Sequence, residues 1–337
     1  MFIRLSLWCV LVSSMLWLAL HVSTYSVHLW RNHHLQQLDK QRIDVAKHRK
    51  ARDLSGDAVV AKFLQEYPIY VSMSSTVSRA DNLKELLPTL ASEYLREILI
   101  VLPPYNLQSL QVYDREKHKR QLTGNNKVKI LYAENDWGPV TKLLPAYRYV
   151  HNRHAKAVLI VIDDDHVYPQ GMINEHIYAL AHHPGYVSTL LPATLGKQTG
   201  RMPAHYQLSI AENLDSMWSK RKAWMVHGAG SIGMRSEDID ISWLQQMLLD
   251  KSTAHCRWSD DLLISLSLAK NGVKPILVHN QYASIAQVEP YMKNSRIGGL
   301  MNITLAQDTA ARSIAAGLSR TASRLQYCVD ALAGKLG

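Results

Sequence analysis

The sequence predicts an α/β fold with a mostly parallel central sheet flanked by helices. The clearest evidence is residues 157–162, a run of aliphatic, mostly β-branched side chains typical of a strand buried on both faces. Similar apolar runs alternate with helical segments between residues 67 and 278, and this alternation favours a parallel sheet with helices on both faces. The chain has 337 residues, of which 47% are apolar, so it can bury a sizeable core.

The expected elements follow one another in regular order. A polar turn separates the first strand from the first helix, Pro103 and Pro104 stop the second strand, and residues 195–203 are expected to form a mobile loop. We expect strands at 68–73, 97–102, 128–132, 157–162, 186–191 and 275–278, helices at 82–95, around Lys142, at 170–181 and at 262–270, and helical spacing at 241–248.

The N-terminus is strongly apolar over residues 5–20 and weakly apolar to Trp30, which together are long enough to span a membrane. We favour an uncleaved signal anchor over a signal peptide cut near residues 23–26, because that region is bulky and lacks Ala-x-Ala. The orientation stays open. The basic residues after the apolar run favour a cytoplasmic domain, whereas the Asn302 sequon is used only in a secretory lumen.

Four segments are expected: an anchor at 1–30, a basic stem at 31–65, a catalytic domain at 66–300 and a helical tail at 301–337 that packs against the domain. The net charge of +10 is partly concentrated in the stem, and no recognition module is visible, so we do not expect nucleic-acid binding.

Cys9 lies in the apolar N-terminus, which leaves one possible cysteine pair, and there is neither a zinc ribbon nor a disulfide framework.

Three carboxylates, Asp163, Asp164 and Asp165, end the strand at 157–162. Side chains alternate along a strand, so Asp163 and Asp165 are expected on one side and Asp164 on the other. Ligands bind at the carboxyl ends of parallel strands, and two carboxylates that converge there repel each other unless a cation lies between them. A hard divalent ion suits such a pair. The alternative, capping of a helix near Pro169, needs only one acid.

Two other motifs allow more than one interpretation. Gly228, Gly230 and Gly233 match the dinucleotide pattern G-x-G-x-x-G, but helical spacing precedes the acid that should end a second strand. Close approach of the backbone to a ligand, or simply a tight turn, explains these glycines better. Asp260 and Asp261 lie at the expected start of a helix, where they either cap it or include a general base.

In their order along the chain, these features resemble GT-A-fold glycosyltransferases, particularly those like family 2. The likeness covers about residues 67–278 and includes the acid-tipped strand, the glycine turn followed by Arg235, and the later acidic pair. It implies that Asp163 and Asp165 hold Mn²⁺ or Mg²⁺ against the diphosphate of a nucleotide-sugar, with Asp165 as the more direct ligand and Asp164 at the nucleotide.

For the remaining positions, the resemblance implies Asp261 as the general base, with Asp260 as the second choice, because the pair is Asp-Asp and not the commoner Glu-Asp. Residues 74–79 and 136–142 are similar to family segments that flank the nucleotide. Arg79 and Lys142 would then contact phosphates, Asp136 the base or ribose, and His279 the metal, unless these are surface or core residues. These residues are the candidate site.

The resemblance therefore implies a membrane-anchored, metal-dependent glycosyltransferase of hexosyltransferase type. It would move a sugar from a nucleotide-sugar, expected to be UDP-linked, to a glycan, protein or lipid acceptor with inversion. If the protein is eukaryotic, the expected compartment is the Golgi or secretory lumen. Two alternatives remain. One is another metal-dependent nucleotide or phosphoryl transferase, although the chain lacks G-x-x-x-x-G-K-[ST]. The other is an inactive, membrane-tethered glycan-binding relative.

Overall fold

The computed structural model describes most of the region between residues 51 and 278. Arg79, Asp165, His279 and the apolar segment 1–30 lie outside the described residues. The described residues are 51–75, 83–84, 86–105, 112, 114, 116, 119–120, 126–164, 168, 171–190, 192–198, 205–210, 223–226, 231–253, 256–257, 259–278, 328 and 331–332.

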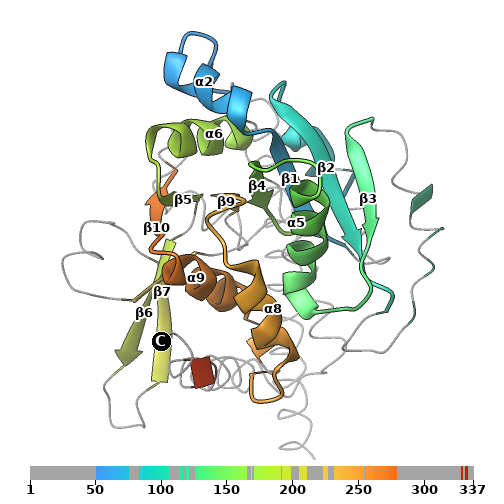
Figure 1. Ribbon diagram of the computed structural model, residues 1–337, viewed down its shortest axis with the longest axis vertical. Helices are drawn as coiled ribbons and strands as arrows, with labels where there is room; N and C mark the ends of the chain where they lie inside the picture. The colour runs from blue at the N-terminus through green and yellow to red at the C-terminus, as the bar shows by residue number, and fades with distance from the viewer. Residues whose placement is uncertain are drawn as a thin grey trace, which may run out of the picture.

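A seven-stranded sheet forms the centre of the molecule, in the order β10-β5-β9-β4-β1-β2-β3 (Figure 1). All neighbouring strands are parallel except β9, which runs antiparallel to both β4 and β5. The predicted α/β class is confirmed, and this mostly parallel sheet fits a GT-A, Rossmann-like fold. The strands are β1 Ile69–Ser74, β2 Leu95–Leu102, β3 Val128–Tyr132, β4 Val158–Val161, β5 Tyr186–Thr189, β9 Ile232–Arg235 and β10 Lys274–Leu277.

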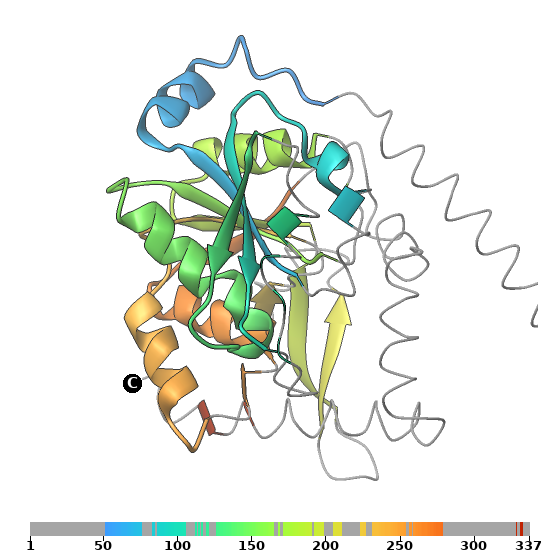
Figure 2. The same cartoon turned by 90° about the vertical axis from the view of Figure 1, so that its right-hand side faces the viewer.

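Helices cover both faces of this sheet (Figures 1 and 2). One core lies between the sheet and α5, α8 and α9, and a second lies between the sheet and α2 and α6. In β4, Leu159 and Val161 enter the first core while Val158 and Ile160 enter the second, so this strand is buried on both faces as predicted. The helices are α2 Ala58–Glu66, α5 Leu144–His151, α6 Met172–His182, α8 Ile241–Leu249 and α9 Asp260–Lys270, with 3₁₀ turns η2 Leu87–Leu90 and η3 Gly138–Lys142.

A smaller antiparallel sheet corrects one prediction. It has the order β7-β6-β8, with β6 Pro192–Gln198, β7 His205–Ile210 and β8 Ala223–Val226. We expected residues 195–203 to form a loop, but residues 195–198 pair with β7 along their whole length. Pairing with strands that come later in the chain satisfies this backbone, and a glycine-containing segment gives no local sign of it.

The helix predicted at 82–95 is also different in the structure. Within the described part of this segment, positions 83, 84 and 86 are helical, η2 follows, and β2 already begins at Leu95. Pro88 lies in the first turn of η2, and a proline restricts the residue before it and removes a backbone donor. Leu95 pairs with Ile69 of β1, so sheet pairing replaces the expected last turn of the helix.

The folded body begins earlier than the expected boundary at residue 66. Helix α2 packs against α6, with Val60 and Phe63 buried in the second core. Asp57 caps α2 by accepting from the backbone N–H groups of its first turn. Arg52 forms an ion pair of 3.0 Å with the buried Glu175 of α6. Residues 51–65, which we assigned to a solvated stem, are therefore part of the folded domain, and the boundaries near 30 and 300 stay predictions.

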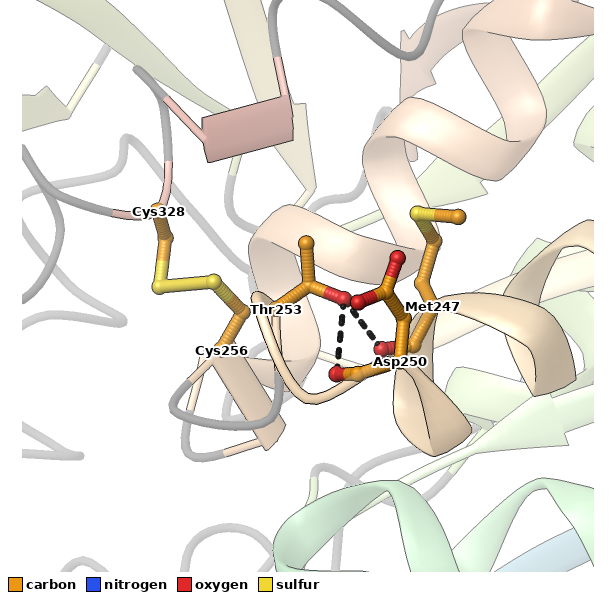
Figure 3. The surroundings of a disulfide bond; sticks show 5 residues. All are labelled: Met247, Asp250, Thr253, Cys256 and Cys328. Carbon is orange, nitrogen blue, oxygen red and sulfur yellow. Dashed lines mark hydrogen bonds between the residues drawn. A yellow bond between two sulfur atoms is a disulfide. The ribbon is translucent and has the colours of Figure 1, made fainter.

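A disulfide joins Cys256 to Cys328, the one pair that the sequence left open (Figure 3). Beside it, Thr253 donates hydrogen bonds to the carbonyls of Met247 and Asp250 and so fixes the turn after α8. Leu332 is buried in the first core. At these described positions the C-terminal tail packs against the domain, as predicted.

Among the residues that the structure describes, no helix is long and apolar enough to cross a membrane. The apolar run at residues 5–20 is not one of them, so the anchor stays a prediction.

Candidate active site

The candidate site lies at the carboxyl edge of the central sheet, where three elements meet. Strand β4 ends at Val161, and Asp163 follows two residues later. Lys142 is the last residue of η3, which contacts β1, and Asp260 is the first residue of α9. The hydroxyl of Ser72 in β1 donates to the Lys142 carbonyl, so the lysine backbone is held against the sheet.

The Lys142 ammonium joins the two acidic motifs. Its Nζ lies 2.5 Å from Oδ1 of Asp163, as a hydrogen bond, and 2.7 Å from Oδ2 of Asp260, as an ion pair that is not aligned as a hydrogen bond. The Lys142 side chain is 3% exposed, whereas that of Asp163 is 29% exposed. A buried charge persists only where opposite charges compensate for the lost water, and here two carboxylates do so.

The electrostatics keep this lysine charged. Burial alone would lower the pKa of Lys142, but the charges of Asp163, Asp260 and Asp261 outweigh burial and hold that pKa well above its usual value. Asp261 is therefore close enough to contribute to the same cluster. The partners of Lys142 in the structure are carboxylates, and its predicted contact with phosphates stays a prediction.

Asp260 and Asp261 are not the cap of α9. The N-cap position belongs to Ser259, whose side chain makes no capping hydrogen bond, and the two acids occupy the first turn of the helix. Asp260 is directed to Lys142, while Asp261 is half-buried and its carbonyl accepts a hydrogen bond from Ser265. Of the two interpretations of this pair, the contact with Lys142 favours a place in the site over capping.

The acids after β4 lie in different surroundings. Asp164 is buried and Asp163 is partly exposed, which agrees with the expected alternation. The Asp163 backbone N–H donates to the Tyr168 hydroxyl over 2.9 Å, which fixes the turn. The roles of Ser72 and Tyr168 could not be predicted, because they depend on contacts that no local pattern reveals.

Asp136 organises the turn that leads to Lys142. Its Oδ1 accepts from the Gly138 N–H over 2.8 Å and from the Thr141 hydroxyl over 3.3 Å. Gly138 has a φ of +68°, a left-handed conformation that glycine adopts readily. Asp136 thus holds the start of η3, and its predicted contact with a nucleotide base or ribose stays a prediction.

The glycine motif does not form a dinucleotide turn at Gly233. This residue lies inside β9, where a Cβ atom would come within 2.5 Å of the Ser188 hydroxyl and 2.7 Å of His176 Nδ1. The next motif residue, Arg235, is buried and donates to the carbonyls of His183 and Tyr186 near the end of α6. Close packing of side chains explains Gly233, and Arg235 is structural.

The donor chemistry at this edge fits a hard divalent ion, because carboxylate oxygens are the ligands that Mn²⁺ and Mg²⁺ accept. Of the two expected metal ligands, Asp163 lies among the described residues, and its Oδ1 already accepts a hydrogen bond from Lys142. Asp165 therefore remains the expected direct ligand. No group of three or more potential ligands occurs among the described residues. Asp165 and His279 lie outside them.

No protein-family model matches the chain, and no curated protein matches it either. Among solved structures, the chain is similar to GalNAc-T7 with UDP, GalNAc and Mn²⁺, at 13% identity over 78% of this chain and 55% of that chain, with a TM-score of 0.42. It is similar to a Pyrobaculum calidifontis mannosyltransferase with GDP-Man and Mn²⁺, at 14% identity over 90% and 95% of the two chains, with a TM-score of 0.38.

A third similar structure is 2-C-methyl-D-erythritol 4-phosphate cytidylyltransferase of Francisella tularensis, at 12% identity over 67% of this chain and 99% of that chain, with a TM-score of 0.36. All three likenesses are distant. The fold assignment therefore rests on the strand order and strand directions of this chain.

Proposed function

We propose that the protein is a membrane-anchored, metal-dependent glycosyltransferase that moves a sugar from a UDP-linked donor to an acceptor hydroxyl with inversion. One observation supports this proposal above the others. Asp163 after β4 and Asp260 in the first turn of α9 are far apart in sequence, yet both contact the amine of Lys142. The two acidic motifs of the resemblance thus share one place at the edge of the sheet where ligands bind.

In the proposed reaction, the bond between the anomeric carbon and the donor diphosphate breaks as the acceptor oxygen attacks from the opposite side. A divalent ion held by Asp165 and Asp163 would supply Lewis-acid stabilisation of the leaving diphosphate. Asp261 takes the proton from the attacking hydroxyl, a contribution of about 10²–10⁴-fold. Lys142 keeps Asp163 and Asp260 at a fixed separation. The sugar donor near Asp163 and the acceptor hydroxyl near Asp261 are thereby kept at a distance and orientation that suit the reaction.

Asp260 is the weaker candidate for the base in this scheme. Its carboxylate is committed to the Lys142 ammonium, and a proton acceptor that already compensates a buried cation is poorly available. Asp261 lies one residue further along the first turn of α9 and is half-buried. We therefore keep Asp261 as the base and assign Asp260 to positioning.

We also propose that the domain lies in a secretory lumen, with Golgi as the expected compartment in a eukaryote. The Cys256–Cys328 disulfide supports this, because disulfides persist in oxidising compartments. A glycan found on Asn302 after expression in a eukaryotic cell would agree with this orientation. A domain recovered with both cysteines reduced and Asn302 unmodified would contradict it.

A donor screen tests the proposed activity. Full-length protein in neutral detergent is incubated with UDP- and GDP-sugars in Mn²⁺, and release of free nucleotide diphosphate is measured. We expect turnover of a UDP-sugar that EDTA abolishes and that Asp261→Asn reduces by at least about 100-fold. Cleavage of a nucleoside triphosphate with no cleavage of a nucleotide-sugar would favour a nucleotide or phosphoryl transferase and contradict the proposal.

A further inference from the structure

A hollow of about 710 Å³ lies at the amino ends of the parallel strands, on the opposite edge from the candidate active site. Its walls come from the last turn of α2, the start of β1 and β2, and the segment between α5 and β4. Helix α2 lies at this end of the sheet (Figure 1). We call it the basic hollow, and its ionisable lining residues are Glu66, Arg96, Arg153, His154 and Lys156.

The basic hollow has an excess of positive charge. Glu66 is its one lining carboxylate, and it forms an ion pair of 3.2 Å with Lys156. Glu97 lies nearby and accepts a hydrogen bond from the Tyr149 hydroxyl. Within the described part of the chain, neither Arg96 nor Arg153 forms an ion pair with a carboxylate. Two guanidinium groups at one open hollow therefore have no ion pair with a described carboxylate.

Arg153 and His154, two of the side chains that line the basic hollow, are held in place by their neighbours. The Arg153 guanidinium stacks 3.6 Å from the centre of the Tyr149 ring and donates to the Tyr149 carbonyl over 2.9 Å. His154 Nε2 is hydrogen-bonded to the Tyr70 hydroxyl over 2.9 Å. Burial and then the charges of Arg96 and Arg153 lower the pKa of His154, which favours the neutral imidazole in this positive field.

We propose that the basic hollow binds a phosphate group, carried either by a phospholipid headgroup or by a soluble phosphate ester. A guanidinium group can donate two parallel hydrogen bonds to a pair of phosphate oxygens. The hollow has two guanidinium groups, and the Lys156 ammonium and the His154 imidazole lie beside them. The last turn of α2 lines the hollow, and α2 follows soon after the apolar and basic residues 1–50. A phospholipid at a membrane that held the N-terminal segment would therefore lie within reach of this surface. This inference does not depend on glycosyl transfer.

Calorimetric titration of the full-length protein in neutral detergent tests the proposal, with EDTA present so that no metal site holds phosphate. The two probes are inorganic phosphate and dioctanoyl phosphatidylinositol 4-phosphate. We expect both to bind, and Arg96→Ala/Arg153→Ala to weaken binding by at least about tenfold. Arg120→Ala/Arg148→Ala, which removes the same charge outside the hollow, should bind like the wild type.

The outcomes separate the sources of the phosphate group. Tighter binding of the lipid than of inorganic phosphate identifies a headgroup site, and equal affinity identifies a site for soluble phosphate esters. Equal weakening by both double variants, or no binding of either probe by the wild type, overturns the proposal. If Arg96→Ala/Arg153→Ala fails to give a wild-type thermal unfolding transition, Arg96→Gln/Arg153→Gln replaces it, with the same expected loss of affinity.

Discussion

Lys142 and His176 are both fully buried ionisable side chains, and the molecule accommodates them in opposite ways. Lys142 keeps its charge among carboxylates at the carboxyl edge of the sheet. His176 of α6 lies against β5 and β9, where its Nδ1 and Nε2 are each 2.7 Å from a serine hydroxyl, and burial lowers its pKa to about 3. Lys142 thus stays charged in the candidate active site, where the proposed chemistry needs a charge, whereas His176 is neutral at a position where it only packs.

The neutral state of His176 follows from its partners. The Ser188 hydroxyl donates its hydrogen to the Gly233 carbonyl over 3.0 Å, so Nδ1 of His176 donates to Ser188. Nε2 then accepts from Ser231, the described non-glycine residue with a positive φ, of +65°. One neutral tautomer thus satisfies both hydroxyls and holds the start of β9, whereas the Lys142 cluster requires a full positive charge.

The largest expected effect concerns the acids around Lys142. Asp261→Asn removes the proposed base but keeps the shape of the side chain, so transfer should fall by about 10²–10⁴-fold. Steady-state turnover of the donor identified by the screen measures this. Asp250→Asn is the control, because Asp250 is a half-buried acid in the turn after α8 that accepts from Ser252. A loss below about tenfold would remove Asp261 from the role of base.

The next effect is on stability. Lys142→Met leaves Asp163 and Asp260 as uncompensated carboxylates and should destabilise the fold by about 3–5 kcal/mol. The control is Lys270→Met, which breaks a 2.9 Å pair with Asp240 at the surface and should cost less than about 1 kcal/mol. Denaturant unfolding of both variants measures the difference. Equal costs would mean that the buried cluster is energetically no different from a surface pair.

The neutral state of His176 should affect how the free energy of unfolding depends on pH. Because its pKa is about 3 in the folded state and about 6.5 when unfolded, the unfolded chain binds one more proton between these values. Stability therefore falls as the pH drops below about 6.5, by up to about 1.4 kcal/mol per pH unit from this residue. His176→Gln should show a shallower loss between pH 6.5 and 4 in denaturant unfolding. Parallel curves for the variant and the wild type would contradict the neutral assignment.

The smallest expected effect is the loss of stability when a side chain is added at Gly233, beside His176. Gly233→Ala places a methyl group against Ser188 and His176 and should cost about 1–3 kcal/mol. Gly56→Ala is the control, since no atom lies within 4 Å of its added Cβ and the change should lie within about 1 kcal/mol of neutral. Thermal unfolding compares the two. A similar midpoint for both variants would show that β9 can shift to admit a side chain.

The two regions also differ in how well the sequence predicts them. The apolar run of β4 and the start of α9 are local patterns, so the positions of Asp163 and Asp260 could be predicted. Their shared contact with Lys142 could not be predicted, because the burial of Lys142 depends on the packing of η3 against β1. The role of Gly233 was missed for the same reason, since His176 and Ser188 come from distant parts of the chain.

Segments without strong periodicity were the hardest to predict. Residues 195–198 form a strand because they pair with β7, and residues 51–65 belong to the domain because α2 packs on α6. Both depend on partners that come later in the chain. Strands β1, β2 and β4 were predictable because they are largely buried on both faces, and such burial requires an apolar run that is visible in the sequence itself.

Calorimetric titration of UDP into the full-length protein, with and without Mn²⁺, tests the central claim most directly, namely that the acids around Lys142 form a metal-dependent donor site. We expect saturable binding in Mn²⁺ that EDTA abolishes and that Asp163→Asn together with Asp165→Asn weakens by at least about tenfold. Binding of UDP that is equally tight with Mn²⁺, with EDTA and in the double variant would contradict the claim.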